Sequence, residues 1–323
     1  MSKYNSITQL ANTINTLNLS FKDELTELIP LLELLEKVNP CSQEYELIDN
    51  NIIISYSLKL NLFNFRNLLP LKLTVQVIGL PVSVCLNGYF GNDRLIENTV
   101  NNRKGLKIIL NRDLPFKNGG KTLSTFVFEN KFSSFNDYLN HLRSPYRRRI
   151  NKALKYREKL IIRKFTSNDF SEEHYKLYLS IMDRTDNPLE TLPIEFFKEY
   201  KAELYEFIEK DTDNIVGFIQ LKQFKNTLYF LFGGFRKKDV VKYDIYFNML
   251  LKIIETGIEK QVDNIEFGQT AEESKLKVGC REKFKYLYVH HSNPVLNFFI
   301  QKLVPYLTYK TYPIRHHVFK AEV

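Results

Sequence analysis

The sequence predicts an α/β protein, with an α+β character, in which helices flank a mixed β-sheet. The stretch IVGFIQLKQFKNTLYFLFGGF (215–235) is typical of an antiparallel hairpin that turns at Lys225-Asn226. The segments after it alternate in period: helix 244–260, strand 264–268, helix 271–279 and strand 284–291. A hairpin followed by this alternation brings antiparallel and parallel strand pairs into one sheet.

The chain before this part divides into two further regions. Residues 1–40 predict two N-terminal helices, 41–132 a sheet-rich lobe, and 133–323 the α/β domain. In the second helix, KDELTELIPLLELLEKV, four leucines recur at helical spacing, and Pro30 is expected to bend or interrupt it. The expected strands of the lobe are 52–63, 71–79, 82–90, 106–111 and 122–129, with a short helix at 94–103.

From residue 133 the pattern becomes helical. We expect a helix over 134–142 and another that starts at Ser144-Pro145, with Ser144 as N-cap. In the second helix one side is apolar and packs, through Tyr146, Ile150 and Leu154. The other side is a basic stripe made of Arg148, Lys152, Lys155 and Lys159. Further on, the pattern predicts strand 161–166, helices 170–182 and 194–204, and strand 204–210.

Composition limits the class of protein. The 323 residues are 44% hydrophobic, enough for a sizeable core. The net charge of +9 is concentrated, because residues 141–164 hold ten basic side chains and one acidic. Three distant cysteines indicate neither a disulfide framework nor a metal site, and adjacent histidines at 290–291 and 316–317 lack a metal-binding pattern. The N-terminus has no secretory signal pattern and no apolar run is long enough to span a bilayer, so we expect a cytoplasmic protein.

After residue 130 five motifs follow in order: FSSFNDYLNHLRSPYRRRINKALK, YFLFGGF, a long helix, NIEFGQT and a helix that ends KLKVGC. This order resembles that of the GNAT superfamily of acyltransferases, and within it the Fem-type, peptidoglycan-biosynthesis-like branch. The resemblance covers about residues 130–295, and residues 45–130 fit a degenerate first GNAT-like lobe. It implies that two neighbouring strands part so that the arm of an acyl donor lies between them.

The resemblance also implies the substrates. The donor is acyl-CoA, an acyl carrier protein or aminoacyl-tRNA, and the acceptor is an amine on a small molecule or peptide. After Phe235 the chain reads RKKDVVKYDIYF and lacks the glycines of the usual GNAT pyrophosphate cradle. Fem-type proteins also lack this cradle. All these donors are polyanions, so the positive charge does not choose among them.

Two residues are catalytic candidates. Glu266 lies in a short strand with apolar neighbours on the opposite face, and burial there would raise its pKa toward that of a general base. The alternative is a structural glutamate, exposed or paired with Lys275. Tyr243, near the start of the long helix, is a candidate general acid or hydrogen-bond donor to the thioester, whereas the neighbouring Asp244 complements the helix dipole.

A larger set is expected to bind the donor. Glycines at the end of the hairpin permit close backbone approach, and basic side chains hold phosphates. The donor-binding candidates are Gly233, Gly234, Arg236, Arg147, Arg148, Lys275 and Gln269. Thr270 with Glu273 forms the pattern of a capping box, and Gly279 that of a helix C-cap.

Three other interpretations remain open. A non-catalytic RNA-binding protein would use the basic helix 143–159. A hydrolase would use Cys280 as nucleophile, although a buried thiol explains that residue more simply. The apolar tail 294–313, which carries Lys302 and Lys310, either contacts a membrane interface or an acyl chain, or forms a buried terminal helix, the simpler account.

Overall fold

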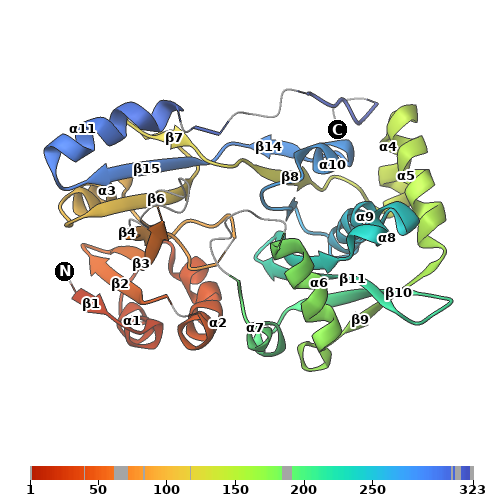
Figure 1. Ribbon diagram of the computed structural model, residues 1–323, viewed down its shortest axis with the longest axis horizontal. Helices are drawn as coiled ribbons and strands as arrows, with labels where there is room; N and C mark the ends of the chain where they lie inside the picture. Colours follow the sequence, from red (N-terminus) through yellow and green to blue (C-terminus); the bar gives the residue numbers. More distant parts are fainter. Residues whose placement is uncertain are drawn as a thin grey trace. The chain divides into compact units, whose positions relative to one another are not determined.

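The computed structural model describes residues 2–39, 41–61, 72–82, 84–116, 118–183, 191–306, 308–309 and 314–320. The chain forms two compact units, each with its own sheet (Figure 1). The first contains Met1–Leu123 and Phe284–Lys310, and the second contains Ser124–Lys283 and Thr311–Val323. Residues 62–63, 71 and 310–313, which the sequence assigned to strands and to the tail, lie outside the described residues.

Unit 1 is built on a mixed sheet in the order β1-β2-β3-β4-β6-β15-β7, with β5 paired to β3. Its pairs are antiparallel except β4 with β6. Its strands are β1 (Ser2–Tyr4), β2 (Gln43–Ile48), β3 (Asn51–Asn61), β4 (Lys72–Ile78), β5 (Tyr89–Phe90), β6 (Leu106–Arg112), β7 (Gly120–Lys121) and β15 (Tyr286–His291). Its helices are α1 (Ile7–Ile14), α2 (Lys22–Val38), α3 (Asp93–Asn101) and α11 (Pro294–Leu303), followed by a 3-10 turn, η2 (Val304–Tyr306).

Unit 1 confirms some expectations and corrects others. The leucines Leu25, Leu28, Leu32 and Leu35 of α2 are buried, as predicted. Pro30 lies inside α2 at an exposed position and does not interrupt it. Of the strand expected over 82–90, only Tyr89–Phe90 forms among the described residues 82 and 84–90. A Cβ on Gly88 would lie 2.2 Å from the backbone of Gly79, so glycine is required sterically at this position.

Unit 2 is the mixed sheet predicted from the sequence, in the order β14-β8-β13-β12-β11-β10-β9. Only β12 and β13 run parallel within it among the described pairs. Its strands are β8 (Thr125–Glu129), β9 (Leu160–Phe165), β10 (Glu203–Glu209), β11 (Ile215–Phe224), β12 (Thr227–Phe235), β13 (Asn264–Glu266) and β14 (Arg281–Lys283). Its helices are α4 (Phe135–His141), α5 (Ser144–Arg157), α6 (Glu172–Met182), α7 (Ile194–Glu199), α8 (Lys237–Tyr243), α9 (Ile245–Glu259) and α10 (Glu272–Lys277), with a 3-10 turn, η1 (Ser167–Asp169).

The core of unit 2 lies between its sheet and the helices α4, α5 and α9. Eleven of the fifteen residues of α9 are buried, so this helix is the centre of the unit. The packing residues predicted in α5 are confirmed, because Ile150 is buried and Tyr146 and Leu154 pack against the same core. Helices α6 and α7 cover the opposite face, where the rings of Phe196 and Phe197 meet Phe232 of β12.

The expected domain boundaries need two corrections. Residues 124–132 were assigned to the sheet-rich lobe, yet β8 pairs with β13 and β14 and so belongs to unit 2. Residues 284–310 were assigned to the C-terminal domain, yet β15 pairs with β6 and β7 and so belongs to unit 1. The chain then returns, and Val318 to Lys320 extend along the start of α5: Arg143 N–H donates to Val318 O (2.9 Å) and Lys320 N–H to His141 O (2.9 Å). This extended entry makes Arg143 the N-cap of α5, in place of the predicted Ser144.

Candidate active site

Strands β12 and β13 pair over three residues, and the pairing stops where β13 ends; we call this point the divergence of the two strands. Their register runs from Thr227↔Asn264 to Tyr229↔Glu266, where β13 ends, while β12 continues to Phe235. On its other side β12 has a bulge at this level, since its register with β11 shifts between Gln220 and Leu221. A bulge bends its strand and increases the local twist. The described backbone of β12 beyond Tyr229 therefore has no β13 partner on that side.

Glu266 lies at the point of divergence. Its Oε1 accepts a hydrogen bond from the Thr125 hydroxyl of β8 and another from the Gly268 N–H (3.0 Å), and the side chain is half-buried. Glu266 and Arg281 are both aligned with Val127 of β8, so the three side chains share one face of the sheet. The two donors on Oε1 fix the direction of the carboxylate.

The turn after Glu266 is held by a buried ammonium. The side chain of Lys275 keeps only 2% of its surface exposed, and its Nζ donates to Gly268 O (3.0 Å) and Gln269 O (2.6 Å). The Phe126 ring lies 5.6 Å from Nζ. Lys275 and Gln269, expected to bind the donor, are thus joined to each other through the turn.

The predicted capping box at this turn does not form. Thr270 and Ala271 both adopt left-handed backbone conformations (φ 63° and 52°), and Ala271 is the N-cap of α10 without a side-chain cap. Thr270 is left-handed and not extended, so it does not take the backbone conformation of an N-cap. The turn is held instead by the Lys275 ammonium, about one helical turn into α10.

Gly279 ends α10 as predicted. Its φ is 101°, Cys280 N–H donates to Lys275 O (3.1 Å) and Gly279 N–H donates to Leu276 O (3.1 Å). These two bonds form a Schellman motif. A Cβ on Gly279 would lie 2.5 Å from the Phe319 ring, so glycine is required sterically as well.

Cys280 follows this cap and is buried. Burial raises the pKa of its thiol strongly, against the opposing effect of Lys275. A protonated, enclosed thiol is a poor nucleophile, so the geometry gives no support to a hydrolase that uses Cys280.

Tyr243 does not lie near Glu266. Its buried hydroxyl donates to Glu209 Oε1, which also accepts from the Lys242 ammonium. Glu209 is two residues after Phe207 in β10, and Phe207 pairs with Gly217 of β11. Gly217 in turn pairs with Phe235, the last residue of β12. Glu266, by contrast, pairs with Tyr229 near the start of β12. Six residues of β12 separate these levels, which is about 20 Å of strand. The structure thus gives Tyr243 a packing role, and the two predicted catalytic residues do not meet.

Tyr246 lies in the first turn of α9, and its ring packs against Phe235 at 5.6 Å, at the end of β12 away from Glu266. Burial raises the pKa of its hydroxyl, with smaller contributions from Cys280 and Glu272. Both tyrosines stand near the start of the long helix in the sequence, where no local signal separates Tyr246 from Tyr243.

The glycines expected to approach a donor have packing neighbours instead. A Cβ on Gly234 would lie 2.5 Å from the backbone of Leu177 in α6, and one on Gly233 would lie 2.8 Å from Met249 in α9. Arg236 donates through Nε to the buried Asp239 (2.7 Å). These glycines therefore allow helices α6 and α9 to pack closely against β12.

The basic helix α5 divides into structural and exposed cations. Arg149 forms a two-pronged ion pair with Asp244 and stacks on Phe247 (3.9 Å), and Arg157 pairs with Glu255 (2.7 Å). The stripe residues Arg148, Lys152, Lys155 and Lys159 are exposed, as predicted, and Arg147 is half-buried. Lys159 lies in the turn after α5, which ends at Arg157, so the helix is shorter than expected. Within the described part of the chain, the side chains of these five residues make no hydrogen bond or ion pair.

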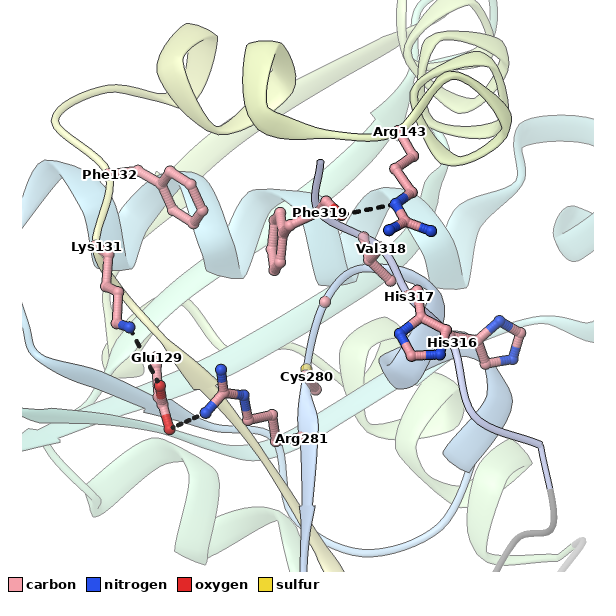
Figure 2. Close-up of a pocket in the computed structure, with 11 residues that line it drawn as sticks. Glu129, Lys131, Phe132, Arg143, Cys280, Arg281, His316, His317, Val318 and Phe319 are labelled. Atoms are coloured by element: carbon pink, nitrogen blue, oxygen red, sulfur yellow. Dashed lines mark hydrogen bonds and ion pairs between the residues drawn. The ribbon is translucent and has the colours of Figure 1, made fainter. Parts of the chain in front are cut away.

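A cationic pocket of about 440 Å³ opens beside β8 and β14 (Figure 2). It is lined by Glu129, Lys131, Phe132, Arg143, Gly279, Cys280, Arg281, His316, His317, Val318 and Phe319. Figure 2 shows Glu129 between Lys131 and Arg281, and Arg143 reaching the carbonyl of Phe319 (2.9 Å). Sequence analysis missed this pocket because its walls come from four distant segments.

One histidine of the pocket has an unpaired polar atom. His316 Nδ1 lies 3.1 Å from the Tyr146 hydroxyl, whereas its Nε2 is buried with no described partner. Among the described residues, no group of three histidine, cysteine or acidic side chains is placed to hold a metal ion.

No helix in the described ranges is long and apolar enough to cross a bilayer.

Comparison with known proteins places the fold. No family model and no curated protein matches the sequence. Among solved structures, FemX aligns with a TM-score of 0.52 at 10% identity, over 93% of this chain and 100% of that one. A conserved protein of unknown function from Bacteroides thetaiotaomicron aligns with 0.51 at 9% identity, over 89% and 98%. The C-terminal DUF2156 domain of a putative lysylphosphatidylglycerol synthetase from Agrobacterium fabrum aligns with 0.50 at 8%, over 92% and 95%.

These likenesses extend over both units. The chain therefore has a GNAT-like fold of the Fem type, as the sequence resemblance implied. At 8–10% identity these likenesses show the fold alone.

The first prediction concerns the buried ammonium. Replacing Lys275 with Met leaves the carbonyls of Gly268 and Gln269 without their donor, so we expect the free energy of unfolding to fall by about 1–3 kcal/mol. Urea unfolding measures the change. The matched control is Lys277→Met on the same helix, whose partner Glu273 is exposed, and it should change stability by less than about 0.5 kcal/mol. Equal losses in the two variants would contradict the role of Lys275.

The second prediction concerns pH. Hydrogen bonding to Lys242, then to Thr212 and Tyr243, lowers the pKa of the Glu209 carboxyl from 4.5 to about 2. A depressed pKa favours the charged form in the folded state, so its stabilisation is complete above about pH 4.5 and is lost as the pH falls toward 2.

Urea unfolding of wild type and Glu209→Gln between pH 2 and 7 tests this dependence. The gap in unfolding free energy should be largest at pH 5–7 and close as the pH approaches 2. Glu199→Gln, at an exposed position, should track the wild type throughout. A gap that is constant with pH would rule out the assignment.

Proposed function

We propose that this chain is an N-acyltransferase that moves an acyl or aminoacyl group from a thioester or ester donor to an amine by direct attack. The observation that carries the proposal is Glu266, held by Thr125 and Gly268 where β12 and β13 part. The GNAT-like fold supports the reaction class by analogy.

In this mechanism the amine attacks the donor carbonyl while Glu266 takes its proton, directly or through one water. The bonds from Thr125 and Gly268 hold the carboxylate in place, so no reorganisation is needed at that moment. The collapse of the tetrahedral intermediate releases a thiolate or alkoxide that needs a proton. The proton that Glu266 took from the amine passes to this leaving group through water, which balances the transfer.

The cationic pocket supplies a place for the anionic group of a substrate. Arg281 aligns with the same residue of β8 as Glu266, two strands away, so about 10 Å separates their backbones. Lys131, Arg143 and Arg281 outnumber the one carboxylate, Glu129. A phosphate or carboxylate bound there would leave the reactive end of the same substrate within reach of Glu266.

The donor is found first by thermal shift across acyl-CoA thioesters, acyl carrier protein conjugates and aminoacyl-tRNA. One class should raise the melting temperature in proportion to RT ln(1 + [L]/Kd). Transfer from that donor to an amine is then followed by mass spectrometry. If no donor class stabilises the protein, the proposal fails.

The third prediction identifies the base. Glu266→Gln keeps the shape and the hydrogen bonds to Oε1 but cannot accept a proton, so we expect turnover to fall by about 10²–10⁴-fold with donor binding retained. Glu273→Gln, at an exposed carboxylate on nearby α10, is the control and should retain wild-type turnover. Undiminished turnover in Glu266→Gln would mean that another group is the base.

A second candidate function rests on the exposed stripe of α5. Arg148, Lys152, Lys155 and Lys159 are exposed and make no described ion pair, which suits contact with the phosphates of RNA. Such contact serves an aminoacyl-tRNA donor as well as a non-catalytic RNA-binding protein. The outcome of the donor screen distinguishes these two roles.

The fourth prediction measures this contact. Four phosphate contacts predict that log K for single-stranded RNA falls with log salt with a slope of about −3. In Lys152→Gln/Lys155→Gln the slope should approach about −1.5. Lys237→Gln/Lys238→Gln removes two exposed cations from α8 and should leave the slope unchanged. A wild-type slope near zero would exclude this surface as an RNA site.

A further inference from the structure

Helix α11 and the turn after it carry an exposed apolar surface on unit 1. The helix has no buried residue. Six large apolar side chains keep between 50% and 86% of their surface exposed: Val295, Leu296, Phe298, Phe299, Leu303 and Tyr306. We refer to these six residues as the α11 face. The buried terminal helix that the sequence analysis preferred is therefore not what forms.

The polarity of α11 is inverted. The helix packs along β15 (Figure 1) through a side that contains Asn297, Ile300 and Gln301, all half-buried. Asn297 Oδ1 accepts a hydrogen bond from the His291 backbone N–H (3.1 Å). A surface helix normally turns its apolar stripe toward the core and its polar side toward water. Here two of the inward residues are polar amides and the outward ones are apolar, so burial within unit 1 does not explain the α11 face.

The segment that carries the α11 face has charge of one sign. Residues 284–310 contain Lys285, Lys302 and Lys310 and no aspartate or glutamate. Lys285 pairs with Asp113 (2.9 Å). Lys302 is exposed on α11 itself, with its ammonium 5.3 Å from the centre of the Phe298 ring. A lysine on an apolar helix face can lay its stem along the surface and keep its charge at the edge. The α11 face thus has a cation on its own helix and no acidic residue in its own segment.

A second copy of the chain fits this surface less well than an anionic bilayer. Residues 294–306 contain Lys302 and no acidic residue, so pairing two α11 faces would give Lys302 no counter-charge from the α11 of the partner. The headgroup of an anionic lipid supplies that counter-charge.

We propose that the α11 face is a membrane-docking surface, which inserts its apolar side chains into the interfacial region of a bilayer that carries anionic lipids. Phe298, Phe299 and Tyr306 have the aromatic character that favours the boundary between acyl chains and headgroups. Lys302 meets the negative surface potential. A single short helix gives reversible, peripheral binding. The inference stands independently of the proposed acyl transfer.

The chain contains no tryptophan, which permits a direct optical test. Phe298→Trp places one fluorophore on the α11 face. Its emission should shift to shorter wavelength with vesicles of phosphatidylglycerol and phosphatidylcholine, and less with phosphatidylcholine alone. Val241→Trp, at a position 85% exposed on α8, is the matched control and should show no shift. Equal behaviour of the two probes would overturn the proposal.

Vesicle co-sedimentation of the full chain tests the same surface without a probe. Phe298→Ser/Phe299→Ser should lower the partition coefficient on anionic vesicles at least tenfold, and Lys302→Glu should weaken binding to anionic vesicles only. Ile161→Ser/Val241→Ser removes two exposed apolar side chains elsewhere and should stay within twofold of wild type. Far-UV circular dichroism verifies that each variant is folded.

Two results would overturn the assignment. One is partition that does not differ between wild type and Phe298→Ser/Phe299→Ser. The other is a dimer, seen by analytical ultracentrifugation without lipid, that Phe298→Ser/Phe299→Ser abolishes, because a second copy would then be the occupant of the α11 face.

Discussion

The hydrogen bonds of the buried Lys275 ammonium hold the candidate site together. A charge removed from water must find strong partners, and this one finds the carbonyls of Gly268 and Gln269. To present both oxygens, the turn takes left-handed conformations at Gly268, Thr270 and Ala271. The same turn directs the Gly268 N–H at Glu266. The orientation of the carboxylate therefore depends on a lysine nine residues away.

The position of Lys275 depends in turn on how α10 ends. The Schellman bonds at Gly279 and Cys280 fix the last turn of the helix, and the Phe319 ring lies against the glycine. Phe319 is held in place by hydrogen bonds of its neighbours Val318 and Lys320 to the start of α5. A chain of contacts thus links the C-terminal tail to the candidate base Glu266, although about fifty residues separate them in the sequence.

A feature of the structure could be predicted from the sequence when the residues that form it are close together in the chain. The stripe of α5 and the leucines of α2 were predicted because helical periodicity is a local property. The hairpin at Lys225-Asn226 was predicted because its turn is local as well. The strand β15 was predicted, but its assignment to the C-terminal domain was wrong because its partners, β6 and β7, lie more than 160 residues earlier in the chain.

The candidate site shows the same limit. Glu266 was identified from its strand, but Thr125, its partner, comes from β8, and the pocket is assembled from four segments. The capping box at Thr270 failed although its local pattern was correct, because a tertiary contact of Lys275 outweighs a cap of about 1 kcal/mol. Tyr243 and Tyr246 are equivalent in the sequence and differ only in what surrounds them.

The basic segment 141–164 shows how one charge run serves two purposes. Four of its ten cations, Arg149, Arg157, Arg163 and Lys164, pair with carboxylates of unit 2. Three of these four are arginines, whose planar, always charged fork suits a half-buried carboxylate. The exposed stripe of α5 is mostly lysine, a mobile point charge suited to a polyanion whose geometry varies. The choice between arginine and lysine thus separates the cations that stabilise the unit from those left for a ligand.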